Sequence, residues 1–212
     1  MSATIENNRI TVFSPSTLQQ ITILDCASPS QVNEKISASK KFKDWINLPL
    51  KKRCLYINQL RKIILANQDK VRDLLIEETG KKDFDAFLEL FSLIEHLKEI
   101  SKIAKKSLRP SRRNSGIMKN KKAMVLYEPL GVAGIISPWN YPHTTPLTSC
   151  VEALLAGNNV ILKPSEHTPL TISYIKELWD QYIGFNQAFE IVLGAGDIGT
   201  LVPDIDKMLM SS

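Results

Sequence analysis

The sequence predicts an α/β protein: a helical N-terminal segment with short strands, followed by a truncated Rossmann-like sheet of parallel βαβ units. Its 212 residues are 43% hydrophobic and 23% charged, which suits a soluble globular chain of one large or two small domains. Helical periodicity dominates up to residue 108. After residue 122, short apolar strands alternate with helices, as in parallel βαβ proteins. We therefore expect two domains, 1–122 and 123–212.

The first quarter of the chain is expected to contain two strands and a helix. Residues 10–13 and 21–24 have the composition of short strands. Ser28, Pro29 and Gln31 predict a helix start, because a serine N-cap and a glutamine three residues later satisfy free amides of the first turn. The apolar residues expected on the buried face of this helix are Val32, Ile36, Phe42 and Trp45.

Three further helices are expected before residue 110. One starts at Pro49 and runs to about residue 66, and another covers 68–80 with Gly80 as its C-cap. The third is one long amphipathic helix that runs from Asp83 to about residue 108. The inward positions expected are Leu55, Leu60, Ile63 and Ile64 in the first of these helices, and Phe84, Phe87, Phe91, Ile94, Leu97, Ile100 and Ile103 in the long one.

The second half is expected to form the parallel sheet, after a polar and basic connector at 110–122. A strand-like run from residue 123 breaks at Pro129. Ligands of parallel sheets bind beyond the carboxyl ends of the strands, where the stretches SPWN and KPSE stand. The further strands are expected at 132–136, 159–162, 189–193 and 207–210, and the helices at 144–156 and 168–182.

The net charge of +5 is concentrated between residues 97 and 122, where ten lysines and arginines accompany one glutamate. A patch for nucleic acid or anionic lipid is one interpretation. A solvated helix end and loop is the favoured one, because nucleic-acid surfaces usually interleave aromatic residues and this segment has none. Nucleic acid is therefore not expected as a partner. A membrane is not expected either, since no apolar run approaches ~20 residues.

The N-terminus lacks the layout of a signal peptide, which makes the cytoplasm the expected location. The three cysteines, Cys26, Cys54 and Cys150, are widely spaced and form no CxxC or Cys/His cluster, so neither disulfides nor a metal site is expected. Cys150 is expected to pack in the core. The histidines, which no serine or cysteine motif accompanies, are expected in surface or capping roles: His96, His143 and His167.

The stretch GIISPWNYP, residues 134–142, ends a predicted strand with a stiff loop. Pro138 and Pro142 restrict their own backbone and that of the preceding residues to extended conformations. Asn140 is therefore held between them. Its side-chain amide either closes a turn or donates a hydrogen bond into a cleft, and the residues alone leave both interpretations open.

Two further stretches stand at the same edge of the predicted sheet. Lys163 and Glu166 have the chemistry to hold the hydroxyl groups of a ribose, or they form an exposed salt-linked turn. GAGDIG at 194–199 matches the pattern G-x-G-x-x-G. It follows the third strand of the series, and Pro203 would stop any helix soon afterwards. A turn is therefore expected there, rather than a dinucleotide fingerprint.

Four stretches, PLGVAGIISPWNYP, ALLAGNNVILKPSEHTP, IVLGAGDIG and DIDKMLM, resemble the aldehyde dehydrogenase superfamily in order and spacing. The stretches FSPST, KFKDWINLPLKKRCLYINQL and EETGKK resemble its first strands and helices more loosely. The resemblance covers nearly the whole chain. It implies the N-terminal, cofactor-binding portion of such an enzyme, with strands of its oligomerisation arm.

The resemblance also implies roles for particular residues. Asn140 matches the asparagine whose amide helps to form the oxyanion hole over the thiohemiacetal. NAD is the implied cofactor, because Glu166 would repel the 2′-phosphate of NADP, and NADP is the alternative. The implied cofactor-binding residues are Ile136, Ser137, Pro138 and Trp139 in the cofactor channel, Lys163 and Glu166 at the adenosine ribose, and Gly196 near the adenine.

The family reaction is the NAD(P)-dependent oxidation of an aldehyde to a carboxylic acid. The resemblance places the cysteine nucleophile, the glutamate base and the pyrophosphate-binding helix start beyond residue 212, and Ser149 stands where many hydrolytic members have a lysine. The chain alone is thus expected to be inactive, to bind cofactor weakly or not at all, and to form a homo-oligomer. Three functions are considered: part of a dehydrogenase, a naturally shortened and inactive relative that acts as an interaction or scaffold protein, and a binder of anionic partners.

Overall fold

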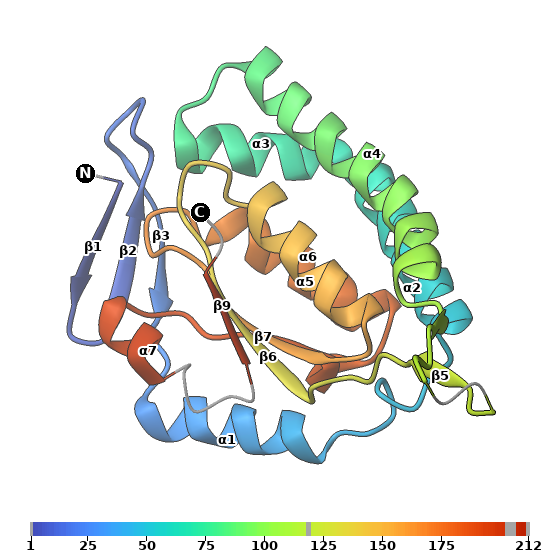
Figure 1. Ribbon diagram of the computed structural model, residues 1–212. Helices are drawn as coiled ribbons and strands as arrows, with labels where there is room; N and C mark the ends of the chain where they lie inside the picture. Colours follow the sequence, from blue (N-terminus) through green and yellow to red (C-terminus); the bar gives the residue numbers. More distant parts are fainter. Residues whose placement is uncertain (1, 118–119, 202–206, 211–212) are drawn as a thin grey trace.

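The computed structural model of the chain describes residues 2–117, 120–201 and 207–210. Within them, an antiparallel sheet at the N-terminus is followed by a group of helices, a two-stranded hairpin and a parallel sheet of four strands (Figure 1). This arrangement confirms the predicted α/β class and its order of segments. The division into domains at residue 122 stays a prediction.

The N-terminal sheet pairs β1 (Ala3–Glu6), β2 (Arg9–Phe13) and β3 (Gln20–Asp25) in chain order. The two later strands were predicted and the first was not. Strand β1 pairs with β2 through a tight turn in which Asn7 and Asn8 both have positive φ, +50° and +61°. Asparagine tolerates this conformation, and a two-residue turn of this kind suits a hairpin. Strand β1 therefore forms because this turn brings residues 3–6 beside β2, and the composition of residues 3–6 alone did not predict it.

Helix α1 (Pro29–Lys41) starts with the predicted capping box. The backbone amide of Gln31 donates to Ser28 Oγ over 3.3 Å, and the amide of Ser28 donates to Gln31 Oε1 over 2.8 Å. The prediction that Phe42 and Trp45 continue its buried face was wrong, because the helix ends at Lys41. Trp45 is nevertheless fully buried in the core.

Three helices follow, α2 (Leu50–Ala66), α3 (Gln68–Thr79) and α4 (Asp83–Ser107), close to the predicted bounds. Gly80 ends α3 with φ +69°, which confirms the predicted C-cap. In α2, Leu55 was expected inside but is exposed.

The buried face of α4 was predicted partly wrongly. The aromatic residues Phe84, Phe87 and Phe91 are exposed, and so is Ile103. The helix is apolar over more than one stripe, and periodicity alone does not choose between neighbouring stripes. The stripe that packs against α2 and α5 is made of Ala86, Glu89, Leu90, Leu93, Ile94, Leu97, Ile100 and Ala104.

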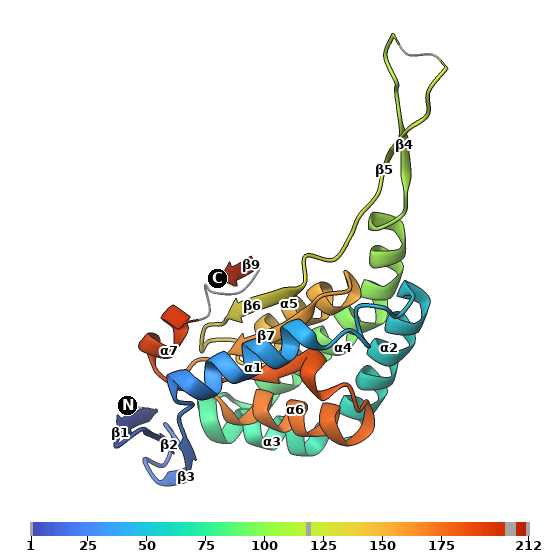
Figure 2. The ribbon, with the colours of Figure 1, turned by 90° about the horizontal axis from the view of Figure 1, so that it is seen from below.

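The stretch predicted as a connector at 110–122 contains a strand. Strand β4 (Ser111–Arg113) pairs with β5 (Ala123–Val125) in an antiparallel hairpin. The prediction missed β4 because Ser-Arg-Arg has no apolar alternation, and only cross-strand pairing identifies it. The hairpin extends away from the rest of the molecule (Figure 2).

The parallel sheet has the order β8-β7-β6-β9, with β6 (Val132–Ile136), β7 (Asn159–Lys163), β8 (Phe189–Ile191) and β9 (Lys207–Met210). All three strand pairs are parallel, which confirms the predicted parallel sheet. Helix α5 (Thr144–Leu155) connects β6 to β7, and α6 (Leu170–Tyr182) connects β7 to β8.

The two faces of this sheet are covered by different helices (Figure 1). One face packs with α2, α4, α5 and α6, and the other packs with α1 and the short helix α7 (Gly196–Leu201). The sheet residues that alternate between the two clusters are Ala133, Ile135, Val160 and Leu162 on the first face, and Val132 and Ile161 on the second.

The order of strands places a topological switch point at β6. From β6 the chain proceeds through β7 to β8 on one side, and it returns to place β9 on the other side. In open α/β sheets, ligands bind at the carboxyl ends of the strands beside such a point. The loops that follow β6 and β7 are therefore the first place to look for a site.

None of the helices in the described part of the chain combines the length and apolar character that crossing a bilayer requires.

Candidate functional site

The loop after β6 is held against the loop after β7. The amide of Ser137 donates to the carbonyl of Lys163 over 3.1 Å, which extends the strand pairing by one bond. Further along, Thr168 Oγ1 donates to the carbonyl of Trp139 over 3.4 Å. Pro138 and Pro142 add their own restriction to the backbone. The loop between β6 and α5 is therefore fixed both by its sequence and by its neighbour.

Asn140 lies near the middle of this loop and is exposed. Its Oδ1 accepts a hydrogen bond from the backbone amide of Tyr141 over 3.1 Å. Because the oxygen is engaged, the Nδ2 group is the part of the side chain that remains to donate. The amide oxygen is thus bound to the adjacent peptide group, a contact between neighbouring residues that closes no turn by itself, and Nδ2 is left as a donor.

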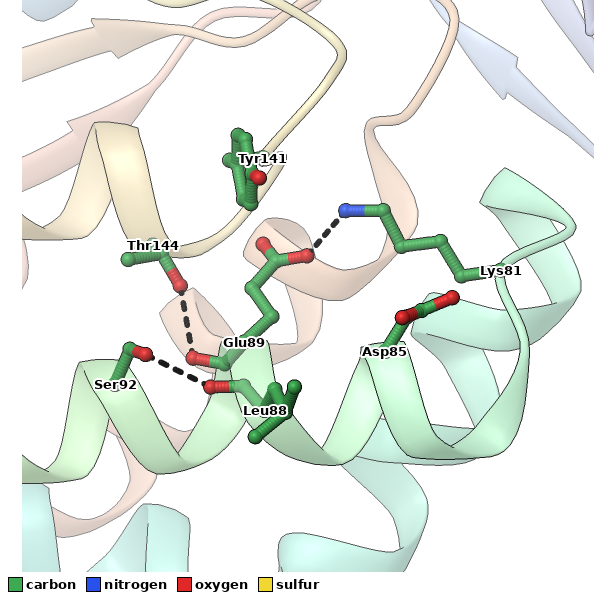
Figure 3. Close-up of a pocket in the computed structure, with 7 residues that line it drawn as sticks. All are labelled: Lys81, Asp85, Leu88, Glu89, Ser92, Tyr141 and Thr144. Carbon is green, nitrogen blue, oxygen red and sulfur yellow. Dashed lines mark hydrogen bonds and ion pairs between the residues drawn. The ribbon is translucent and has the colours of Figure 1, made fainter.

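Lys81, from the turn between α3 and α4, binds the backbone of this loop. Its Nζ donates to the carbonyl oxygen of Asn140 over 2.7 Å, and it forms an ion pair with Glu89 of α4. The same ammonium lies 4.5 Å from the ring centroid of Tyr141, a cation–π contact. Figure 3 shows the Lys81 ammonium reaching the Glu89 carboxylate beneath Tyr141.

Glu89 is a buried carboxylate with partners from two other elements. Its side chain is 2% exposed, and its Oε1 lies 3.1 Å from Nδ1 of the fully buried His143. Burial alone would raise the pKa of Glu89, but His143 and Lys81 bring that pKa below its ordinary value. The carboxylate therefore stays ionised. His143 stands at the N-cap position of α5, but its side chain makes no capping hydrogen bond and is fully buried beside Glu89, so the predicted surface or capping role of that side chain was wrong.

Two neighbouring hollows open beside these residues. The first, of about 370 Å³, is lined by Lys81, Asp85, Leu88, Glu89, Ser92, Tyr141 and Thr144 (Figure 3). The second, of about 270 Å³, is lined by Ser2, Pro15, Leu18, Glu78, Thr79, Lys81, Trp139, Asn140 and Thr168. Lys81 lines both hollows, and the loop between β6 and α5 contributes Tyr141 to the first and Trp139 and Asn140 to the second.

Lys163 and Glu166 form an ion pair at the carboxyl end of β7, with Nζ and Oε2 3.0 Å apart. Lys163 is 4% exposed, so the pair is not the exposed salt link that was the alternative prediction. Burial would raise the pKa of Glu166, but a backbone amide and Lys163 lower it below its ordinary value. The pair thus offers an ionised carboxylate and an ammonium at one edge of the sheet.

Ile136 and Ser137 lie at the neighbouring strand end. Ser137 is 6% exposed, and its hydroxyl has no hydrogen-bond partner among the described residues. Helix α7 is close by, because a Cβ on Gly199 would stand 3.6 Å from Ile136 and 3.8 Å from Lys163. Four of the predicted cofactor-binding residues therefore gather at one edge: Ile136, Ser137, Lys163 and Glu166.

Residues 194–195 of the GAGDIG stretch have no regular structure, and from Gly196 onwards the stretch is helix α7. The expectation of a turn was therefore wrong. Gly194 is required by close packing, since a Cβ there would lie 2.4 Å from Ile198. Gly196 begins α7 with open space around it. Pro203, the predicted helix stop, lies outside the described residues.

The cysteines and His96 have structural surroundings. Cys150 is fully buried and burial raises the pKa of its thiol, which confirms its predicted role in core packing. Cys26 and Cys54 are buried as well. His96 lies 3.8 Å from Glu152 of α5, whose side chain is exposed. In the described ranges, no group of three or more His, Cys, Asp and Glu residues could hold a metal ion.

A parallel sheet that is covered by helices on both faces and has a switch point between its strands defines a doubly wound α/β protein. The sequence pattern of the aldehyde dehydrogenase family matches residues 3–208. The chain therefore belongs to the aldehyde dehydrogenase family, as the resemblance implied.

Relatives of known sequence agree with this assignment. A Mycobacterium tuberculosis protein, provisionally named an NADP(+) succinate-semialdehyde dehydrogenase, is 35% identical over 169 residues, which cover 79% of this chain and 32% of that protein. An N-succinylglutamate 5-semialdehyde dehydrogenase from an Enterobacter species is 30% identical over 189 residues, or 87% of this chain and 38% of that one. The chain thus spans about a third of the length of these relatives.

Solved structures share the fold. Lactaldehyde dehydrogenase from Escherichia coli superposes with a TM-score of 0.89 at 24% identity, over 97% of this chain and 44% of that chain. An aldehyde dehydrogenase from Bacillus cereus in complex with NAD+ gives a TM-score of 0.86 at 24% identity, over 95% and 42%.

Proposed function

We propose that this chain supplies the cofactor-ribose site and an oxyanion donor of an NAD(P)-dependent aldehyde dehydrogenase. The observation that carries the proposal is the Asn140 loop. It places a side-chain amide at a hollow beside the sheet edge, with the amide oxygen already bound by the Tyr141 amide. A preorganised donor of this kind is what a developing oxyanion requires.

The residues at the sheet edge fit a dinucleotide. The buried Ser137 hydroxyl has no partner in the described part of the chain, and an orphaned buried hydroxyl is costly unless a ligand pairs with it. Lys163 and Glu166 supply the donor and the acceptor that ribose hydroxyls need. Bound there, the cofactor would supply the hydride acceptor. The other residues that we assign to its channel are Ile136, Pro138, Trp139 and Gly196.

The choice between NAD and NADP follows from Glu166. Its carboxylate is ionised in the fold and would repel a 2′-phosphate, which favours NAD. The neighbouring Lys163 ammonium offsets part of that repulsion, so NADP is the alternative cofactor.

The chemistry that we assign to Asn140 concerns the substrate oxygen. When a thiolate adds to an aldehyde, negative charge develops on the carbonyl oxygen, and a fixed amide donor stabilises that charge. None of the three cysteines offers the thiolate, because all are buried. We therefore propose that the nucleophile comes from a part of the enzyme other than these 212 residues. On this proposal the chain alone does not oxidise aldehydes.

An active assembly that contains this chain tests the role of Asn140. In it, Asn140→Ala should lower kcat by about 100-fold or more, because the lost donor acts on charge that appears only after attack. The affinity for NAD should stay unchanged. Asn33→Ala, on the exposed face of α1, is the matched control and should retain full turnover.

The opposing result is equally specific. If Asn140 only closes the turn, the variant loses thermal stability and cofactor affinity together. An unchanged kcat in a folded Asn140→Ala variant would show that Asn140 has no catalytic role. If every assembly with a longer portion also proves inactive, the interaction or scaffold role becomes the favoured function.

Self-association and the cytoplasmic location stay predictions. We propose a homo-oligomer in which the β4–β5 hairpin takes part, because Met124 on this protruding hairpin is exposed and both strands are edges of a two-stranded sheet.

A further inference from the structure

The turn between α3 and α4 reaches across to the loop after β6 through a single side chain. Lys81 has three protons on its ammonium, and the structure provides three acceptors for them. They are the carboxylate of Glu89, the carbonyl oxygen of Asn140 and the ring face of Tyr141. The side chain is 22% exposed, so it is largely removed from water.

One peptide group carries both contacts that matter for Asn140. The carbonyl oxygen of the peptide between Asn140 and Tyr141 accepts from Lys81 over 2.7 Å. The N–H of the same peptide donates to Asn140 Oδ1 over 3.1 Å. Rotation of this peptide would therefore break the Lys81 bond and release the Asn140 side chain together. The direction of the Nδ2 donor is coupled to the ammonium of Lys81.

Glu89 anchors this arrangement from the opposite side. Its carboxylate binds Lys81 with one oxygen and lies 3.1 Å from His143 with the other. His143 follows the loop directly and precedes α5. The carboxylate thus contacts two groups, one that holds the middle of the loop and one that stands at its end. Because Glu89 is buried on α4, its carboxylate is held in one position and so are the two groups that contact it.

We infer that Lys81 is a positioning residue for Asn140: it holds the peptide group that orients the side-chain amide, and Glu89 fixes Lys81 in turn. Lys81 does not contact the reacting atoms in this scheme. The inference rests on the proposed function for its catalytic meaning, but the positioning itself is measurable on the chain alone.

The test compares Lys81→Met with Lys82→Met. Methionine keeps the length of the side chain and removes the charge, and Lys82 is the exposed neighbour that serves as the matched control. The readouts are the χ1 rotamer populations of Asn140 and the ¹⁵N order parameter of the Tyr141 amide. We expect one rotamer and an order parameter of about 0.85 in the wild type and in Lys82→Met, and averaged rotamers with a value below about 0.6 in Lys81→Met.

Two additional variants separate positioning from stability. Lys81→Arg keeps the cation and should restore most of the order. Removal of Lys81 leaves Glu89 with one fewer partner, and an uncompensated buried charge can unfold a protein. If Lys81→Met does not fold, the double variant Lys81→Met/Glu89→Gln removes that charge and should show the same loss of order.

The positioning role of Lys81 and the oxyanion role of Asn140 are tested by different results. A folded Lys81→Met or double variant in which Asn140 keeps a single rotamer would overturn the positioning role and leave the oxyanion role standing. Conversely, loss of order in Lys81→Met that Lys82→Met does not share supports positioning, whatever the Asn140→Ala assay shows about turnover.

Discussion

Glu78 is the buried carboxylate whose removal we expect to change the pH dependence of stability most. It stands near the end of α3 and is fully buried. Its Oε2 accepts from the amide of Leu170 over 2.7 Å, and its Oε1 accepts from the amide of Thr171 over 3.1 Å and from the Thr171 hydroxyl. A side chain of α3 thus caps the first turn of α6.

Burial dominates the titration of this group. It raises the pKa of Glu78 from 4.5 to about 7, although hydrogen bonds from Thr171 and Leu170 act in the opposite direction. Because the folded pKa lies above the unfolded one, the folded state holds the proton more tightly. The stabilising contribution is therefore complete below about pH 4.5 and is lost as pH rises through about 7. At about 1.4 kcal/mol per pKa unit, the loss is about 3 kcal/mol.

Urea unfolding between pH 4.5 and 8 measures this contribution. Glu78→Gln removes the titration, so its free energy of unfolding should fall with pH by about 3 kcal/mol less than that of the wild type. Glu77→Gln, at the exposed neighbouring position, is the control and should follow the wild type. If the three pH curves run parallel, Glu78 does not titrate in this range and the reasoning from its burial is refuted.

Further predictions concern activity and assembly. The purified chain with NAD and an aldehyde should produce no NADH, because its three thiols are buried; steady production that Cys150→Ala abolishes would refute this. Light scattering at tens of micromolar should give a multiple of the chain mass, because the hairpin strands β4 and β5 each leave an edge unpaired within the described residues. A clean monomer mass would count against the homo-oligomer.

The features predicted correctly from the sequence depend on local chemistry. The Ser28 cap, the Gly80 C-cap and the alternation of strands and helices each follow from a few adjacent residues. The location of Lys163 and Glu166 at the sheet edge was predictable in the same way, because Lys163 ends β7 and Glu166 follows three residues later; their role at a cofactor stays a prediction.

What the sequence did not reveal depends on contacts between distant segments. Strand β4 exists through its pairing with β5, and the α4 residues that are buried are decided by α2 and α5. The group formed by Lys81, Glu89 and His143 joins three elements. One signal was available: Glu89 shares helical spacing with Ala86 and Leu93, and a charge on such an apolar stripe indicates a buried partner.

The burial of Glu78 also depends on a distant segment and was not predictable from the sequence. It follows another glutamate at the end of a helix, and nothing in its neighbours distinguishes the two. Only the approach of α6 buries it, 92 residues further along the chain. Burial of a carboxylate by a distant helix start is a tertiary event, so neither composition nor periodicity predicts it.

Chemical-shift mapping of the ¹⁵N-labelled chain with NAD tests the central claim most directly, which is that this chain carries the cofactor-ribose site. On titration to millimolar NAD, we expect the largest shifts at Ser137, Trp139, Lys163 and Glu166. Glu166→Gln should weaken them, whereas Glu177→Gln, on the exposed face of α6, should leave them unchanged. Shifts confined to the basic β4–β5 hairpin, or sheet-edge shifts that Glu166→Gln leaves unchanged, would contradict the claim.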